Sequence, residues 1–132
     1  MQQKFKLTLA QLNAKVGDLS GNCEQAFQAW EAATAANSDM VMLPEMFATG
    51  YQVQDLVMKP AFLKDTIAHI DSLAKRCANG PTMGIGGPSK DAHGLYNAYY
   101  ILSGGSIQVI IKKHNLPNHA VFDEKRFYKS AE

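Results

Sequence analysis

The chain has 132 residues, which is long enough for one domain and too short for two of ordinary size. Hydrophobic residues make up 46% of it and charged residues 19%, a balance that is typical of a globular domain and excludes a disordered tail. Its 13 lysines and arginines nearly balance its 12 aspartates and glutamates without forming a basic block, so neither nucleic acid nor an anionic membrane is an expected partner.

The first elements expected are a strand and a helix. Residues 4–12 alternate apolar and polar side chains, which predicts a half-buried strand that ends before the turn residues at 17–21. Asn22 then has the position of a helix N-cap, with Gln25 three residues later as in a capping box. Apolar side chains recur at helical spacing after it, so we expect an amphipathic helix over residues 23–37.

A second strand and a second helix follow. Residues 41–43 form a short apolar run, typical of a buried strand, which Pro44 ends. Residues 44–60 predict a long loop rich in aromatic and polar side chains. Residues 61–78 have the strongest helical period in the chain, and the Asn-Gly-Pro sequence at 79–81 is a typical helix end.

The next part of the chain has the composition of strands. Residues 82–86 predict a third strand. Two β-rich runs at 95–102 and 106–112 flank Ser-Gly-Gly at 103–105, and this arrangement predicts a hairpin. The order strand, helix, strand, helix, strand, hairpin indicates an α/β layered fold.

Glu45 is the first candidate for chemistry. It directly follows a predicted buried strand and Pro44, so we expect it at the carboxyl edge of the sheet, where catalytic groups of α/β proteins gather. A carboxylate in that place can act as a general base. From position alone, a structural role as a cap or as a partner in an ion pair stays open.

Lys113 is the second candidate. It follows the last strand of the predicted hairpin, where a lysine held by a carboxylate can stabilise an oxyanion. Lys112 beside it points to the opposite face of the strand, so only one of the two lysines can face a pocket. The alternative is an ordinary solvated lysine at a strand end.

The two cysteines, Cys23 and Cys77, are too few for a disulfide scaffold and lack the spacing of metal ligands. Both fall on apolar faces of predicted helices, where buried structural cysteine is the commoner case, so neither is an expected nucleophile. The histidines show no ligand spacing, and we expect no metal site. This sparse use of cysteine makes a reduced, cytoplasmic setting the expected location. No apolar run approaches the roughly 18 residues of a membrane span.

Three segments resemble motifs of the carbon–nitrogen hydrolase (nitrilase) superfamily. Residues 9–13 resemble its opening strand, residues 43–47 resemble its glutamate motif, and residues 113–119 resemble its lysine motif. The stretch that continues over 121–127, together with Asp-Leu at 55–56, is most similar to the N-terminal glutaminase domain of the glutamine-dependent NAD+ synthetases. The similarity covers the whole chain.

The resemblance implies an αββα sandwich in which a mixed sheet has two helices on one face, with a Glu-Lys-Cys triad. In it, Glu45 is the general base and Lys113 stabilises the tetrahedral intermediate. Glu124 matches a second glutamate that helps to position the lysine. His119 stands where the pattern usually has a tyrosine that contacts the substrate.

The resemblance also implies a reaction and its partners. A cysteine thiolate attacks the side-chain amide of glutamine, ammonia leaves, and water hydrolyses the thioester. The ammonia then passes to a C-terminal synthetase domain of the same polypeptide, which uses ATP and Mg2+ to make NAD+ from deamido-NAD+. No cofactor is expected for residues 1–132 themselves.

The family's nucleophilic cysteine follows several tens of residues after the lysine motif. We therefore expect residues 1–132 to be the N-terminal portion of a glutaminase domain, without a nucleophile and inactive alone. Missing strands leave sheet edges unpaired and an apolar face exposed, which predicts a homo-oligomer. Two alternatives stay open: a nitrilase-like amidase for another small amide, which His119 favours, and a non-catalytic interaction module of the same fold.

Overall fold

Helices and strands alternate at the start of the chain, and the elements that the structure describes from residue 82 onward are strands. The computed structural model describes residues 3–51, 54–113, 118–119, 122–123 and 129. The elements in chain order are β1 (Leu7–Leu9), α1 (Leu19–Ala35), β2 (Met40–Met42), the 3-10 helix η1 (Gln54–Met58), α2 (Pro60–Arg76), β3 (Thr82–Asp91), β4 (Gly94–Ser103), β5 (Ser106–Lys112), β6 (Asn118–His119) and β7 (Phe122–Asp123).

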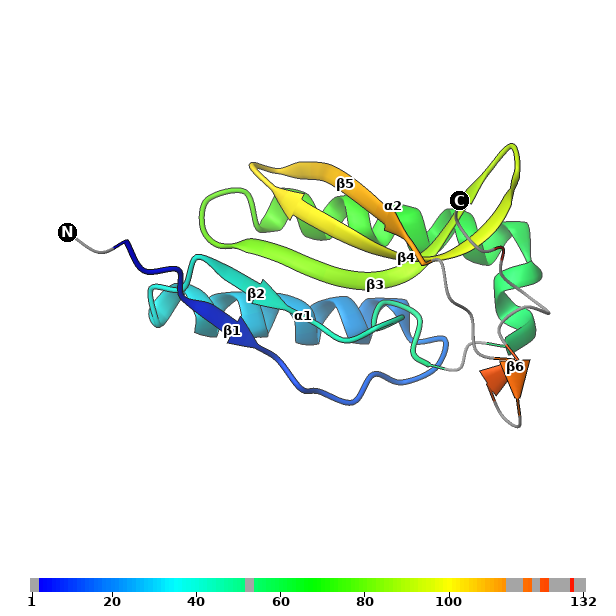
Figure 1. Ribbon diagram of the computed structural model, residues 1–132, viewed down its shortest axis with the longest axis horizontal. Helices are drawn as coiled ribbons and strands as arrows, with labels where there is room; N and C mark the ends of the chain where they lie inside the picture. Colours follow the sequence, from blue (N-terminus) through cyan, green and yellow to red (C-terminus); the bar gives the residue numbers. More distant parts are fainter. Residues whose placement is uncertain (1–2, 52–53, 114–117, 120–121, 124–128, 130–132) are drawn as a thin grey trace.

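Five of these strands form one mixed sheet in the order β1-β2-β3-β4-β5 (Figure 1). β1, β2 and β3 run parallel, since the helical connections α1 and α2 return the chain to the same edge. β3, β4 and β5 run antiparallel, and the turn between β4 and β5 falls at residues 104–105, as predicted. β6 and β7 form a separate two-stranded sheet. The predicted α/β layered fold is confirmed.

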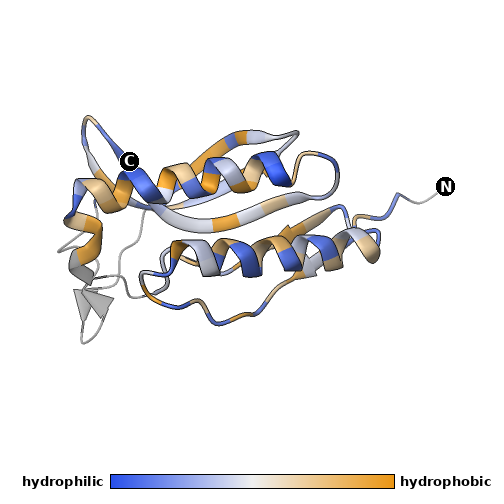
Figure 2. Cartoon of the chain, turned by 180° about the vertical axis from the view of Figure 1, so that it is seen from behind, coloured by the Kyte–Doolittle hydropathy of each residue, from blue (hydrophilic) through white to orange (hydrophobic). Residues whose placement is uncertain are grey.

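Both helices cover the same face of the sheet. They lie behind it in Figure 1 and in front of it in Figure 2, which views the chain from the opposite side. Trp30 of α1 and Ile70 of α2 belong to one buried cluster with Val41, Ile85 and Tyr100 of the sheet. Fully burying an apolar side chain of this size contributes about 1.5–3 kcal/mol, so this layer stabilises the packing of both helices on the sheet.

The start of α1 differs from the prediction. Its N-cap is Asp18, whose Oδ1 accepts a hydrogen bond from the N–H of Gly21 at 3.0 Å. Asn22, the predicted cap, is fully buried inside the helix, where its side chain bonds the backbone of Lys15 and the carbonyl of Ala48. The prediction was wrong because the amide of Asn22 holds the loop before the helix at Lys15 and the turn at Ala48, so it does not cap the helix.

Two strands differ in length from the prediction. β1 covers three residues and not 4–12, because its partner β2 is itself only three residues long. β3 continues past Gly86 to Asp91, because β4 pairs with it along its whole length. Backbone N–H groups alternate in direction along a strand, so the nitrogen of Pro88 faces the side of β2. Because β2 has already ended at Met42, no ladder hydrogen bond is lost there, and Pro88 is tolerated.

The second face of the sheet is apolar and open to solvent. The strand registers place one row of residues across all five strands on this face. At the two edge strands, Leu9 is 64% exposed and Val109 is 49% exposed. Such a face matches what one layer of a two-sheet sandwich presents to the other. The row consists of Leu9, Met42, Gly84, Ile101 and Val109.

Candidate active site

Glu45 lies at the carboxyl edge of the parallel strands, as its place after β2 predicts. The chain beyond β2 stays bonded to β3, because the N–H of Gly86 donates to the carbonyl of Pro44 at 3.3 Å and the N–H of Ala48 donates to the carbonyl of Gly86 at 3.0 Å. Residues 44–48 are thereby held as a turn against the sheet. This fixed backbone places Glu45 where ligand and catalytic groups gather in α/β sheets.

The turn approaches β3 so closely that only glycine fits at position 86. A Cβ on Gly86 would lie 2.1 Å from the backbone nitrogen of Met46 and 2.8 Å from the Cα of Glu45, well below a normal contact. Met46 has a φ of +53°, which is uncommon for a residue other than glycine, and its side chain is buried. Surrounding packing holds this unusual backbone in place, a feature that often occurs at functional sites.

Lys113 reaches Glu45 from the end of β5. Its backbone N–H donates to the carbonyl of Asn97 at 2.8 Å, which extends the pairing of β4 and β5 by one residue. Its Nζ donates to Oε1 of Glu45 at 2.5 Å and forms an ion pair with it. The side chains of Glu45 and Lys113 are 45% and 30% exposed, so a substrate can reach both. The structure therefore brings together two residues predicted from separate motifs.

Asn97 is a third polar residue of the site, and the sequence reasoning missed it. The residue is 2% exposed, and its Nδ2 donates to Oε1 of Glu45 at 3.0 Å. The available signal was a lone asparagine among Tyr96, Ala98 and the other apolar residues of a predicted strand. Because buried amides are almost always hydrogen-bonded, such a residue indicates a polar partner nearby.

The three polar residues border an open cavity of about 350 Å³, which Ala98, Tyr99 and Ile111 also line. Tyr99 forms a rigid wall, because its hydroxyl donates to the carbonyl of Leu43 at 2.8 Å. Its ring covers Gly84, where a Cβ would lie only 2.5 Å from the ring. Burial raises the pKa of Tyr99 to about 12, so this wall is uncharged at neutral pH.

Neither cysteine of the chain lines this cavity. Both are buried, Cys23 in α1 and Cys77 at the end of α2. Burial raises the pKa of Cys23 to about 11 and that of Cys77 to about 12, with nearby Arg76 opposing the shift in each case. Because the thiolate is the reactive form, these environments suit structural cysteines and not nucleophiles.

Two further predicted site residues, His119 and Glu124, have side chains outside the part of the chain that the structure describes. The backbone of His119 belongs to β6, and its side chain lies outside what the structure describes. Glu124 lies outside the described residues altogether. The substrate contact at His119 and the support of Lys113 by Glu124 therefore stay predictions.

The sequence pattern of the carbon–nitrogen hydrolase family matches residues 6–132. The chain belongs to this family. The glutamine-dependent NAD(+) synthetase of Rhodobacter capsulatus is 52% identical to it over 128 residues, which cover 97% of the chain and 23% of that protein. The chain thus spans about a quarter of the length of the curated relatives it matches, and the predicted family resemblance is confirmed.

Solved structures of related carbon–nitrogen hydrolases show the same fold. A glutamine-dependent NAD(+) synthetase from Cytophaga hutchinsonii has a TM-score of 0.90 and 26% identity, covering 96% of this chain and 22% of that one. An amidase from Nesterenkonia sp. with an acetamide moiety added covalently at its active-site cysteine has a TM-score of 0.81 and 14% identity, covering 97% and 48%. The predicted nitrilase-type fold is confirmed.

The predicted cofactors, ATP and Mg2+, concern a synthetase domain outside residues 1–132, and they stay predictions. In the described ranges, 3–51 and 54–113 with the short segments after them, no group of three histidines, cysteines, aspartates or glutamates could hold a metal ion. Within the same ranges, neither helix has the length and hydrophobicity needed to cross a membrane.

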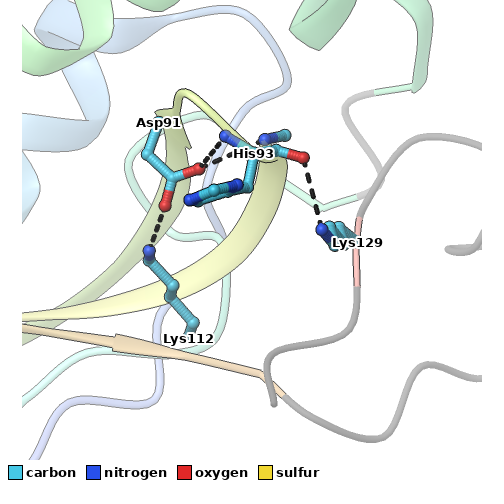
Figure 3. A network of polar contacts seen from close by, with 5 residues as sticks. Asp91, His93, Lys112 and Lys129 are labelled. Atoms are coloured by element: carbon cyan, nitrogen blue, oxygen red, sulfur yellow. Dashed lines mark hydrogen bonds and ion pairs between the residues drawn. The ribbon is translucent and has the colours of Figure 1, made fainter.

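Lys112 turns away from Glu45, as the alternation of strand side chains predicts. Its Nζ forms an ion pair with Asp91, at the turn between β3 and β4. Figure 3 shows that Asp91 also accepts hydrogen bonds from the backbone of His93 and Gly94, and that Lys129 donates to the carbonyl of His93. This network ties the β3–β4 turn to the last residue of β5, directly before the lysine that meets Glu45.

Replacing Asp91 by asparagine is expected to remove a pH-dependent part of the stability. The hydrogen bond from Lys112 lowers the pKa of Asp91 below 3.8, and the bond to Asp91 raises the pKa of Lys112 above 10.5. The contribution of Asp91 is complete above its ordinary pKa and is lost as the pH falls through its lower folded value. The contribution of Lys112 is complete below its ordinary pKa and is lost as the pH rises through its higher folded value.

Chemical unfolding of the unchanged chain and of Asp91→Asn measures this effect. The difference in unfolding free energy should be largest near neutral pH and should shrink as the pH falls through the lowered pKa of Asp91. Asp71→Asn is the control, since Asp71 forms a more exposed pair with Lys75 that contributes little. An equal difference at all pH values would contradict the assignment.

Proposed function

We propose that the protein hydrolyses the side-chain amide of glutamine, with Glu45 as general base and Lys113 as the group that stabilises the oxyanion. The observation that supports this most directly is the 2.5 Å contact between Nζ of Lys113 and Oε1 of Glu45 at the carboxyl edge of the sheet. A carboxylate and an ammonium held together can move a proton and stabilise the negative charge that develops on the oxygen of the reacting amide. The name of the 52% identical relative, a glutamine-dependent enzyme, supports glutamine as the substrate.

The reaction consists of two acyl transfers. Glu45 takes the proton of a cysteine thiol from outside residues 1–132, and the sulfur attacks the amide carbon. Lys113 stabilises the negative charge on the oxygen of the tetrahedral intermediate. As the C–N bond breaks, the proton on Glu45 passes to the nitrogen, which leaves as ammonia. Glu45 then takes a proton from water, the hydroxide oxygen attacks the thioester, and glutamate leaves as the thiol regains the proton.

We further propose that a second domain consumes the ammonia. A synthetase domain of the same polypeptide uses it to convert deamido-NAD+ to NAD+, with ATP and Mg2+ bound there. Two facts support this arrangement: the relatives are named NAD(+) synthetases, and the chain spans about a quarter of their length. The remaining length of such proteins is sufficient for at least one further domain.

A chimaeric protein tests the proposed reaction. Residues 1–132 are joined to the part of the Rhodobacter capsulatus relative that follows its matching region. We expect this protein to release ammonia from glutamine faster than from asparagine or propionamide. A preference for another small amide would replace glutamine by the nitrilase-like alternative. A folded chimaera that releases no ammonia from any amide would support the non-catalytic interaction module.

The open face of the sheet leads to a second expected result, that the 132-residue chain self-associates. Contiguous exposed apolar surface favours pairing with another molecule. Exchanging Leu9 and Ile111, which are 64% and 52% exposed, for serine and threonine should lower the apparent mass in light scattering. Ile67→Ser on α2, where the side chain is 39% exposed, is the control and should change nothing. A monomer before substitution would contradict the prediction.

A further inference from the structure

We infer that Asn97 is a positioning residue that sets the geometry of both Glu45 and Lys113. The inference rests on the proposed function, because it names the residue that orients the proposed base. Asn97 contacts the two charged residues through different groups. Its side-chain Nδ2 donates to Oε1 of Glu45 at 3.0 Å, and its backbone carbonyl accepts from the N–H of Lys113 at 2.8 Å. One residue therefore holds both members of the ion pair.

The side chain of Asn97 restrains the carboxylate of Glu45. Oε1 receives two donors, Nδ2 of Asn97 and Nζ of Lys113. Among the residues that the structure describes, no hydrogen bond reaches Oε2 of Glu45. The carboxylate is thus held against rotation, and Oε2 is the oxygen left to take and return the proton. Such restraint matters because a misplacement of about 1 Å can slow a reaction about 100-fold.

The chemistry of asparagine fits this position. Its amide stays neutral at every pH, so it donates to the carboxylate without a positive charge that would compete with Lys113. It lies on β4, which is bonded to β3 on one side and β5 on the other, so its backbone has little freedom to move. An aspartate of the same shape would be an acceptor only and would place a second negative charge beside Glu45, which disfavours the ionised base.

The first test uses the 132-residue chain and does not depend on activity. In ¹H–¹⁵N NMR spectra, the side-chain amide signals of Asn97 should move with pH, because protonation of Glu45 weakens the bond they make to Oε1. The same signals should lose this pH dependence in Glu45→Gln. Signals of Asn97 that ignore pH, or that respond equally in Glu45→Gln, would overturn the inference.

The second test uses the chimaeric protein and glutamine. Asn97→Ala should lower kcat about 10- to 100-fold with little change in KM. It should also move the acid limb of the pH profile to higher pH, because the ionised carboxylate has lost a donor, and Asn97→Asp should move it further. Thr66→Ala is the control for lost stability, since Thr66 is fully buried on α2, bonds the backbone of its own helix and does not line the cavity.

The two tests separate the inference from the proposed function. If the chimaera releases no ammonia but the Asn97 signals follow Glu45, the proposed function fails and the positioning contact stands. If ammonia is released and Asn97→Ala lowers kcat no more than Thr66→Ala, with an unmoved acid limb, the inference is overturned while the proposed function stands.

Discussion

Glu45→Gln is expected to slow ammonia release from glutamine by about 10²- to 10⁴-fold in the chimaeric protein, the range that a general base supplies. The glutamine side chain has the same shape and can still accept the bond from Asn97 at Oε1. It cannot take a proton from a thiol or from water, so both acyl transfers lose their base. The fold should persist, since the side chain of Glu45 is 45% exposed.

The control for this result is Glu31→Gln, which makes the same chemical change at an exposed position of α1. It should leave the rate within a factor of about two, since exposed charges far from a site have small effects. Thermal unfolding of both variants checks that the fold is intact. A folded Glu45→Gln variant with an unchanged rate would remove Glu45 from the mechanism.

Gly86→Ala is expected to cause the largest loss of stability among the substitutions considered. The added methyl group would lie 2.1 Å from the backbone nitrogen of Met46, so the turn that holds Glu45 must leave β3 or the strand must shift. Overpacking typically costs about 1–3 kcal/mol, and a clash with backbone that cannot yield belongs at the upper end of that range. Thermal unfolding of the 132-residue chain should show a midpoint lower by roughly 10 °C.

Gly87→Ala is the matched control, one residue along the same strand. Its methyl group would meet only side-chain atoms, the Cδ1 of Ile70 at 3.2 Å and the Cε1 of Tyr100 at 3.5 Å. Because these ends can move slightly, we expect a cost of less than about 1 kcal/mol. Equal midpoints for the two variants would show that the close approach of the turn to β3 does not exist in solution.

Local patterns were sufficient to predict most of the elements. The helical period over residues 61–78 matches α2, because one apolar face of that segment packs on the sheet. Ser-Gly-Gly at 103–105 sets the turn between β4 and β5, since glycines adopt the positive φ angles that the turn contains. The position of Glu45 also followed from local order, because a residue just after a buried parallel strand lies at its carboxyl edge.

Features that depend on distant residues were not predictable in the same way. Asn22 resembles a helix cap in sequence, yet its side-chain amide donates hydrogen bonds to the carbonyls of Lys15 and Ala48. The role of Gly86 depends on a turn 40 residues earlier, although a glycine inside a strand is a general sign of close backbone approach. The contact between Asn97 and Glu45 joins residues 52 apart, and neither neighbourhood reveals it alone.

A double-mutant cycle on Glu45 and Lys113 shows whether the two side chains act together in amide hydrolysis. The rate of ammonia release from glutamine is measured in the chimaeric protein for Glu45→Gln, for Lys113→Met and for the double variant, each checked for folding. If the two side chains act together, each single substitution already removes their joint effect on the rate. The double variant should then be at most a few-fold slower than the slower of the two single variants. Single variants that keep nearly the full rate, or a double variant in which two independent losses multiply, would contradict the account.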